Sequence, residues 1–144
     1  MNTINQVCAF MENKPGELAK ILKQLSDNDI NLRALNIAET ADYGVLRFIC
    51  NDASKAAKVL NENGFLASKA EVMAIKVDDA PGGLEALLGM LAESGVDIAY
   101  MYSVFSFAKG GAYMVIHPKD MAALNACAAK NGIQAASADE LGIK

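Results

Sequence analysis

The chain has 144 residues, of which 53% are hydrophobic and 21% are charged, and its formal net charge is -4. This acidic balance provides no basic surface for nucleic acid or anionic lipid, so both classes of partner are excluded. No apolar stretch approaches the roughly 20 residues that a membrane-spanning helix needs, and residues 1–6 lack the basic start of a signal peptide. We therefore expect a cytoplasmic protein.

Strand and helix patterns follow one another through the first half of the chain. Apolar residues occur on both faces of the first predicted strand, which is typical of a central strand. Leu18, Ile21, Leu22 and Leu25 recur at helical spacing and form one apolar stripe. The predicted elements are a strand at 4–11, a helix that ends near 27–28, a hairpin of strands at 30–38 and 45–50, a helix from 53 to a cap at 63–64, and a strand at 65–77.

The second half repeats this order, beginning within the strand that ends near Val77. Its first helix carries a stripe of the same spacing, made of Leu84, Leu87, Leu88 and Leu91. The predicted elements are a helix that ends at 94–95, strands at 96–107 and 112–117 joined by a turn at 109–111, a helix to 130 with a cap at 131–132, and a last strand at 133–138.

The clearest internal repeat is a Pro-Gly loop between a strand and a helix. Asn13-Lys14-Pro15-Gly16-Glu17-Leu18 returns as Asp79-Ala80-Pro81-Gly82-Gly83-Leu84. The repeat predicts two tandem units, residues 1–70 and 71–144, each with the order βαββαβ. This order is the ferredoxin-like α+β arrangement, an antiparallel sheet with both helices on one face. Its crossovers place the second strand at an edge, where it can pair with another copy.

With these loops, stripes and strand starts, both halves resemble the ACT domain family of amino-acid-sensing modules. The family shows an acidic or Asn residue two positions before Pro-Gly, a Leu two positions after it, and a Gly-x-Asn-Ile start to the second strand. The matches are Asn13, Pro15, Gly16, Leu18 and Asn31 in the first unit, and Asp79, Pro81, Gly82, Leu84, Gly95 and Ile98 in the second. Asp29 and Asp97 depart from the pattern, where the family has Gly and Asn. The whole chain is similar to free-standing tandem ACT proteins.

The resemblance implies that a small amino acid binds at a unit or subunit interface near the Pro-Gly loops. A helix N-terminus offers unpaired backbone N–H groups to a carboxylate, and a glycine lets the ligand approach the backbone. The ligand's ammonium group needs acceptors, and the family pattern places Asp97, Asn31 or the Asp79 carboxylate near the same loop. The expected binding residues are Asn13, Pro15, Gly16, Glu17, Leu18, Asn31 and Leu32 in the first unit, and Asp79, Pro81, Gly82, Gly83, Leu84, Asp97, Ile98 and Tyr100 in the second.

The same residues have a purely structural interpretation. Asn13 and Asp79 would then cap their helices, and each Pro-Gly pair would only close a tight turn. Of the two loops we favour the second, because Gly82-Gly83 predicts an open loop whereas Glu17 adds negative charge to the first. The aromatic residues of the strand at 96–107 are expected to lie in the core or an interface, with Tyr100 on a face that could also line a side-chain pocket.

The sequence shows no grouping of residues for catalysis or metal binding. It has one histidine, His117, and three cysteines, Cys8, Cys50 and Cys127, which we expect to be buried free thiols. We therefore predict a non-catalytic regulatory sensor without a cofactor, forming a homodimer through edge strands. The alternatives are a regulatory subunit of a biosynthetic enzyme such as an acetolactate synthase-like complex, a small ferredoxin-like enzyme and a structural dimerisation module.

Overall fold

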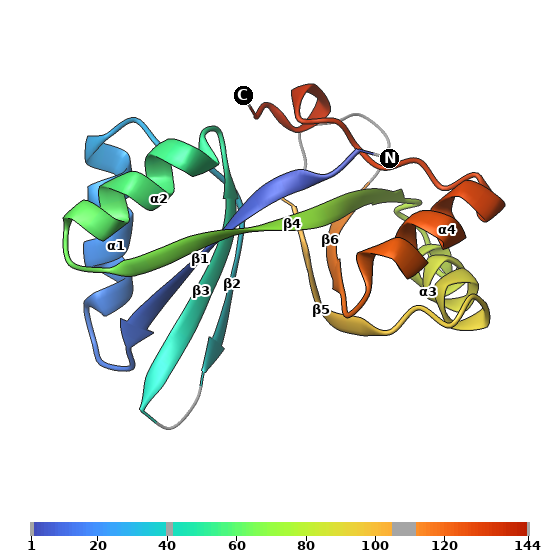
Figure 1. Cartoon of the computed structure of the whole chain (residues 1–144), viewed down its shortest axis with the longest axis horizontal. Coiled ribbons are helices and arrows are strands. Elements are labelled where there is room, and N and C mark those ends of the chain that lie inside the picture. Colours follow the sequence, from blue (N-terminus) through green and yellow to red (C-terminus); the bar gives the residue numbers. More distant parts are fainter. Residues whose placement is uncertain (1, 40–41, 105–111, 144) are drawn as a thin grey trace. The chain divides into compact units, whose positions relative to one another are not determined.

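The computed structural model describes residues 2–39, 42–104 and 112–143. Over these residues the chain forms six strands, four α-helices and one short 3₁₀ helix (Figure 1). The α-helices and strands are β1 (Ile4–Glu12), α1 (Glu17–Asp27), β2 (Leu32–Glu39), β3 (Tyr43–Cys50), α2 (Ala53–Glu62), β4 (Leu66–Val77), α3 (Gly83–Glu93), β5 (Ile98–Ser103), β6 (Ala112–Pro118) and α4 (Met121–Asn131). The predicted α+β class and order of elements are confirmed up to α4. The turn predicted at 109–111, together with Phe105 and Phe107, lies outside the described residues.

Contacts divide the described chain into two compact units. The N-terminal unit consists of Asn5–Ala70 with residues 142–143, and the C-terminal unit consists of Glu71–Leu141 with residues 2–4. Strand β4 is continuous from one unit into the other, as the absence of a Pro or Gly cluster there predicts. No helix within the described ranges is long and apolar enough to cross a membrane.

The N-terminal unit has the strand order β2-β3-β1-β4, with β1 and β3 at its centre and β2 at an edge, as predicted. Antiparallel pairing sets Val7 of β1 opposite Phe48 of β3, and both side chains are fully buried. Helices α1 and α2 cover this same face, because Ile21 and Leu60 belong to the same core cluster as the two strand residues. The predicted helix stripes therefore form the core.

The C-terminal unit has the strand order β4-β6-β5, with β5 at an edge. Ile75 of β4 and Ile116 of β6 form its core with Leu91 of α3 and Leu124 of α4, which places both helices on one face. One member of the predicted stripe departs from this arrangement. Leu84, in the first turn of α3, is 37% exposed, whereas Leu87 and Leu91 are buried.

The strand predicted at 133–138 is wrong. In its place the structure has a single bridge between Ile75 and Ala135, and then a 3₁₀ helix, Asp139–Leu141. The segment Ala135-Ala136-Ser137-Ala138 contains no β-branched or aromatic side chain to pack on a sheet. The Ser137 hydroxyl also accepts a hydrogen bond from the Glu140 amide (3.3 Å), which favours the turn.

The departure of Asp29 from the family pattern has a backbone explanation. Asp29 follows α1 with φ of 59°, and Gly95 occupies the corresponding place after α3 with φ of 71°. Left-handed backbone is open to glycine and is tolerated by Asp better than by most residues. The two units thus make the same turn with different residues.

Candidate functional site

The two Pro-Gly loops adopt nearly the same backbone conformation. Gly16 has φ of 88° and ψ of -12°, and Gly82 has φ of 86° and ψ of -6°; each is the residue that precedes its helix. A side chain at such a φ is strained, so both positions call for glycine. The predicted strand-to-helix position of both loops is confirmed.

Helices α1 and α3 begin differently from the other two helices. Asp52 caps α2 by accepting from the Lys55 amide (3.1 Å), and Asp120 caps α4 by accepting from the Ala122 amide (2.9 Å). The residue at this position in α1 and α3 is a glycine, which has no side chain to accept. The first turns of α1 and α3 therefore present backbone N–H groups that no such carboxylate covers.

The capping interpretation fails for Asp79. Within the described residues the Asp79 side chain accepts no hydrogen bond, and it lines a cavity instead. Asn13 donates its side-chain amide to Glu39 Oε2 (3.5 Å), which links the first loop to the end of β2. Whether either residue contacts a ligand stays a prediction.

Charged side chains in and beside the first loop form ion pairs with one another. The buried Glu17 carboxylate lies 3.1 Å from Lys20 Nζ and 3.9 Å from Lys14 Nζ, and Lys14 also pairs with the exposed Glu12 (2.9 Å). The hydrogen bond between Lys14 and Glu12 lowers the pKa of Glu12 and raises the pKa of Lys14. A carboxylate ligand at this helix N-terminus would meet the Glu17 carboxylate.

A cavity of about 430 Å³ lies beside the first loop and is mainly apolar apart from its acidic groups. Its lining includes Glu12, Glu17, Phe10, Tyr43 and Leu66. Phe10 and Tyr43 are tilted rings with centroids 6.1 Å apart, and each is nearly half exposed. The chemistry of this cavity does not suit an anion.

The second loop borders a cavity of about 390 Å³ without a buried carboxylate. Its lining includes the exposed Asp78 and Asp79, Pro81 and Leu84, together with Ala112 and Met114 of β6. Neither of these two β6 residues belongs to the set predicted from the sequence. The antiparallel pairing of Val77 with Ala112 brings them to the loop, and their distance along the chain hides it.

Gly83 is required by the turn itself, and its contact with a ligand stays a prediction. A Cβ at this position would overlap the Asp78 carbonyl oxygen and would lie 3.0 Å from the carbonyl carbon. Gly83 therefore lets the chain fold tightly back on Asp78, and its amide donates to the Ala80 carbonyl (3.0 Å). The loop is compact at Gly83 and open at Gly82, where an added Cβ would meet nothing within 4 Å.

The predicted binding residues at the starts of β2 and β5 lie at the end of each sheet that is away from the Pro-Gly loop. In the C-terminal unit the loop follows Val77, which pairs with Ala112, whereas Ile98 pairs with Pro118. At about 3.3 Å per residue, the six-residue offset along β6 separates the two ends by roughly 20 Å. In the N-terminal unit Leu32 pairs with Cys50, at the end of β3 away from the loop. The expectation that Asn31 and Asp97 lie near the loop of their own unit is wrong.

The residues at those far ends have local partners. Asp97 pairs with Lys119 (3.1 Å) and is exposed, and Tyr100 stacks on His117 with centroids 4.8 Å apart and an angle of 11°. The Asn31 backbone N–H donates to Asn51 Oδ1 (2.9 Å), and the Asn31 side chain is exposed. Asn31 and Asp97, which precede β2 and β5, thus each present an exposed polar side chain to solvent.

The three cysteines are free thiols. Cys50 and Cys127 are buried as predicted, and Cys8 is half-buried. Burial raises the pKa of Cys50 to about 11, so its thiol is neutral and unreactive at physiological pH. No group of His, Cys, Asp or Glu in the described part of the chain is arranged to hold a metal ion.

Comparison with known proteins gives a family and a set of similar folds. A family model described as an ACT domain pair matches residues 2–138. A protein of known structure from Bacteroides thetaiotaomicron is 36% identical, with a TM-score of 0.88 over 97% of this chain and 96% of that one. No curated protein matches the chain.

Two more distant structures share the fold. The ligand-free regulatory subunit of aspartate kinase from Thermus thermophilus is 16% identical, with a TM-score of 0.60 over 88% of this chain and 95% of that one. The corresponding subunit from Thermus flavus is 17% identical, with a TM-score of 0.57 over the same shares. At this identity the likeness concerns the arrangement of strands and helices.

Proposed function

Because the chain belongs to the ACT domain pair family, we propose that it is a non-catalytic, cytoplasmic regulatory protein that binds a small amino acid at its second Pro-Gly loop. The observation that carries this proposal is the difference between the two loops. The second combines a glycine-led helix N-terminus with a cavity that contains Asp79, Pro81 and Leu84. The first places the buried Glu17 carboxylate at the corresponding helix start.

The amide groups at the start of α3 would bind the carboxylate of the amino acid. Charge-assisted hydrogen bonds contribute about 1.5 to 3 kcal/mol each, and the helix dipole adds roughly 0.3 to 1 kcal/mol. For so small a ligand, a Kd of about 1 µM to 1 mM is the expected range. The Asp79 carboxylate is an acceptor for the ammonium group in the same cavity.

A second acceptor would come from another copy of the chain. Asn31 and Asp97 lie too far from the loop of their own unit, as the pairing register requires. We propose that copies pair through an edge strand, so that an exposed strand start of one copy approaches the loop of the other. Regulation then follows if the ligand favours one subunit arrangement over another. Size-exclusion chromatography with light scattering tests the dimer, and a monomer at all concentrations would contradict this part.

Titration calorimetry against the twenty amino acids tests the binding. Leu84→Glu places a carboxylate in the second cavity, and Leu66→Glu places one in the first, where Leu66 is 66% exposed. We expect binding to be lost in Leu84→Glu and kept in Leu66→Glu. If binding were instead lost in Leu66→Glu and kept in Leu84→Glu, the ligand would be assigned to the first loop. If neither variant lost binding, neither loop would be the binding site.

A second function is docking on a catalytic partner as a regulatory subunit of a biosynthetic enzyme. The observation that favours it is a set of exposed apolar side chains in the N-terminal unit, Phe10, Ile37, Tyr43 and Leu66, each at least 40% exposed. Apolar surface of this kind is typical of protein interfaces. Affinity purification of the tagged chain from its own cells should then retrieve a catalytic subunit, and its loss in Tyr43→Lys would locate the contact.

A further inference from the structure

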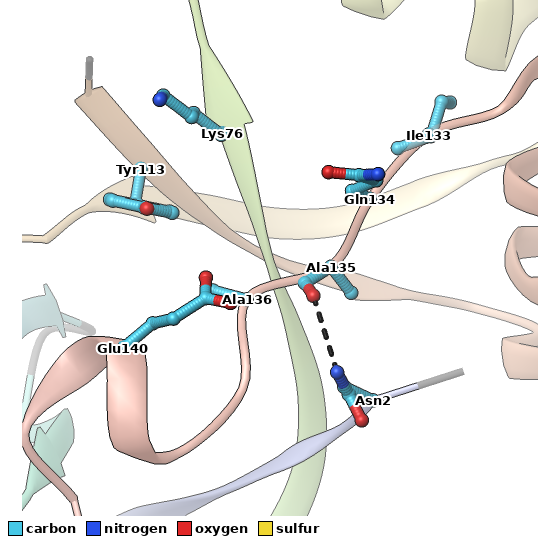
Figure 2. Close-up of a pocket in the computed structure, with 8 residues that line it drawn as sticks. All are labelled: Asn2, Lys76, Tyr113, Ile133, Gln134, Ala135, Ala136 and Glu140. Atoms are coloured by element: carbon cyan, nitrogen blue, oxygen red, sulfur yellow. Dashed lines mark hydrogen bonds between the residues drawn. The ribbon is translucent and has the colours of Figure 1, made fainter. Parts of the chain in front are cut away.

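A separate cavity of about 470 Å³ lies beside β4 in the C-terminal unit (Figure 2). Its polar lining comes from Asn2, from Lys76 of β4, from Tyr113 of β6, and from Gln134 and Glu140 in the segment after α4. It shares no lining residue with the cavity at the second Pro-Gly loop. Its volume falls within the roughly 300 to 1,000 Å³ of small-molecule sites.

The cavity exists because the segment after α4 pairs with β4 only once. Ile75 bridges Ala135, and the Ala136 amide donates to the Ala74 carbonyl (2.7 Å). Continued pairing would set Gln134 opposite Lys76, but among the described residues the ladder does not extend that far. Asn2 Nδ2 donates a hydrogen bond to the Ala135 carbonyl oxygen (3.5 Å). The segment after α4 is therefore tied to β4 at Ala135 and Ala136, and among the described residues it is not paired with β4 at Lys76.

Two opposite charges line this space without pairing. Within the described part of the chain, neither the Lys76 ammonium nor the Glu140 carboxylate has an ionic partner within 4.0 Å, although both line the cavity. Tyr113 is directly opposite Lys76 across β4 and β6, so both side chains are on the same face of the sheet. Figure 2 shows Lys76, Tyr113 and Glu140 on one side of the cavity, with Gln134 and Asn2 on the other.

We propose that this cavity binds a small zwitterion, a molecule that carries an ammonium and a carboxylate group a few bonds apart. Lys76 and the Tyr113 hydroxyl would bind the carboxylate, while Glu140 and the side-chain carbonyl of Gln134 would bind the ammonium. A simple anion would face Glu140 and a simple cation would face Lys76. Only a ligand with both charges satisfies the two groups together, and an α-amino acid or a dipeptide has this chemistry.

The test uses the full chain with amide NMR and titration calorimetry. The probes are the twenty L-amino acids and glycylglycine, with acetate and methylammonium as single-charge probes. At least one zwitterion should shift the amides of Lys76, Tyr113 and Gln134, and Lys76→Met and Glu140→Gln should each raise its Kd by about tenfold or more. Both side chains are exposed, so the thermal midpoint of each variant should stay close to that of the parent.

Matched controls are Lys130→Met in α4 and Glu93→Gln in α3, which are exposed charges outside the cavity. They should leave the Kd unchanged. The proposal is overturned if no zwitterion shifts these amides at millimolar concentration, or if acetate or methylammonium binds as tightly as any zwitterion. It is also overturned if binding persists in Lys76→Met and Glu140→Gln but disappears in Leu84→Glu, because the ligand would then occupy only the Pro-Gly loop.

Discussion

Three glycines, one before α3, one at its first position and one in its interior, should respond to alanine in three different ways. Gly82→Ala adds a Cβ that meets nothing within 4 Å but must adopt φ of 86°, which costs roughly 1 to 2 kcal/mol. Gly83→Ala drives its Cβ into the Asp78 carbonyl, where only backbone movement relieves the overlap, at a cost of about 3 kcal/mol or more. Gly89→Ala, within the helix and also without close neighbours, should stabilise by roughly 0.5 to 1 kcal/mol.

Urea denaturation followed by circular dichroism measures the free energy of unfolding of all three variants. In thermal unfolding, each kcal/mol should move the midpoint by about 4 °C. Gly89→Ala is the matched control, because it makes the same chemical change in the same helix. If Gly83→Ala were as stable as Gly89→Ala, the tight return on Asp78 would be unnecessary. If Gly82→Ala matched the parent, the left-handed backbone would carry no penalty and this position would not require glycine.

Further predictions concern capping, the buried thiol and the left-handed aspartate. Asp120→Ala removes a helix cap and should lower the free energy of unfolding by about 1 kcal/mol, as measured by denaturation. Asp79→Ala should lower it by less than about 0.5 kcal/mol but should weaken amino-acid binding, as measured by calorimetry. In iodoacetamide labelling at pH 8, mass spectrometry should find Cys8 modified before Cys50; equal rates would contradict the burial. Because the pKa of Cys50 rises from 9.0 to about 11 on folding, its thiol ionises first in the unfolded chain, and stability should fall as pH rises through this window. The fall in stability should be smaller in Cys50→Ala. Asp29→Gly should raise stability by roughly 0.5 to 1 kcal/mol, measured by thermal unfolding.

The sequence by itself determined the features that depend on near neighbours in the chain. The helix stripes ending at Leu25 and Leu91, the stop of α1 at Asp27 and the turn at each Pro-Gly pair all follow from spacing and local backbone preference. The repeat of these local patterns then identified two ferredoxin-like units. Local preference also misled where it was weak, because 133–138 was predicted as a strand although 135–138 has no β-branched or aromatic side chain to pack on a sheet.

Only the tertiary structure decided which of the predicted site residues lie together. Pairing register moves Asn31 and Asp97 away from the loop of their own unit and brings Ala112 to it, and no pattern within the loop reports on a partner strand about 30 residues away. The role of Gly83 was hidden for the same reason, since it depends on the path of the Asp78 carbonyl. The unpaired charges of Lys76 and Glu140 meet in one cavity because the chain after α4 leaves the sheet, which is a property of packing and not of composition.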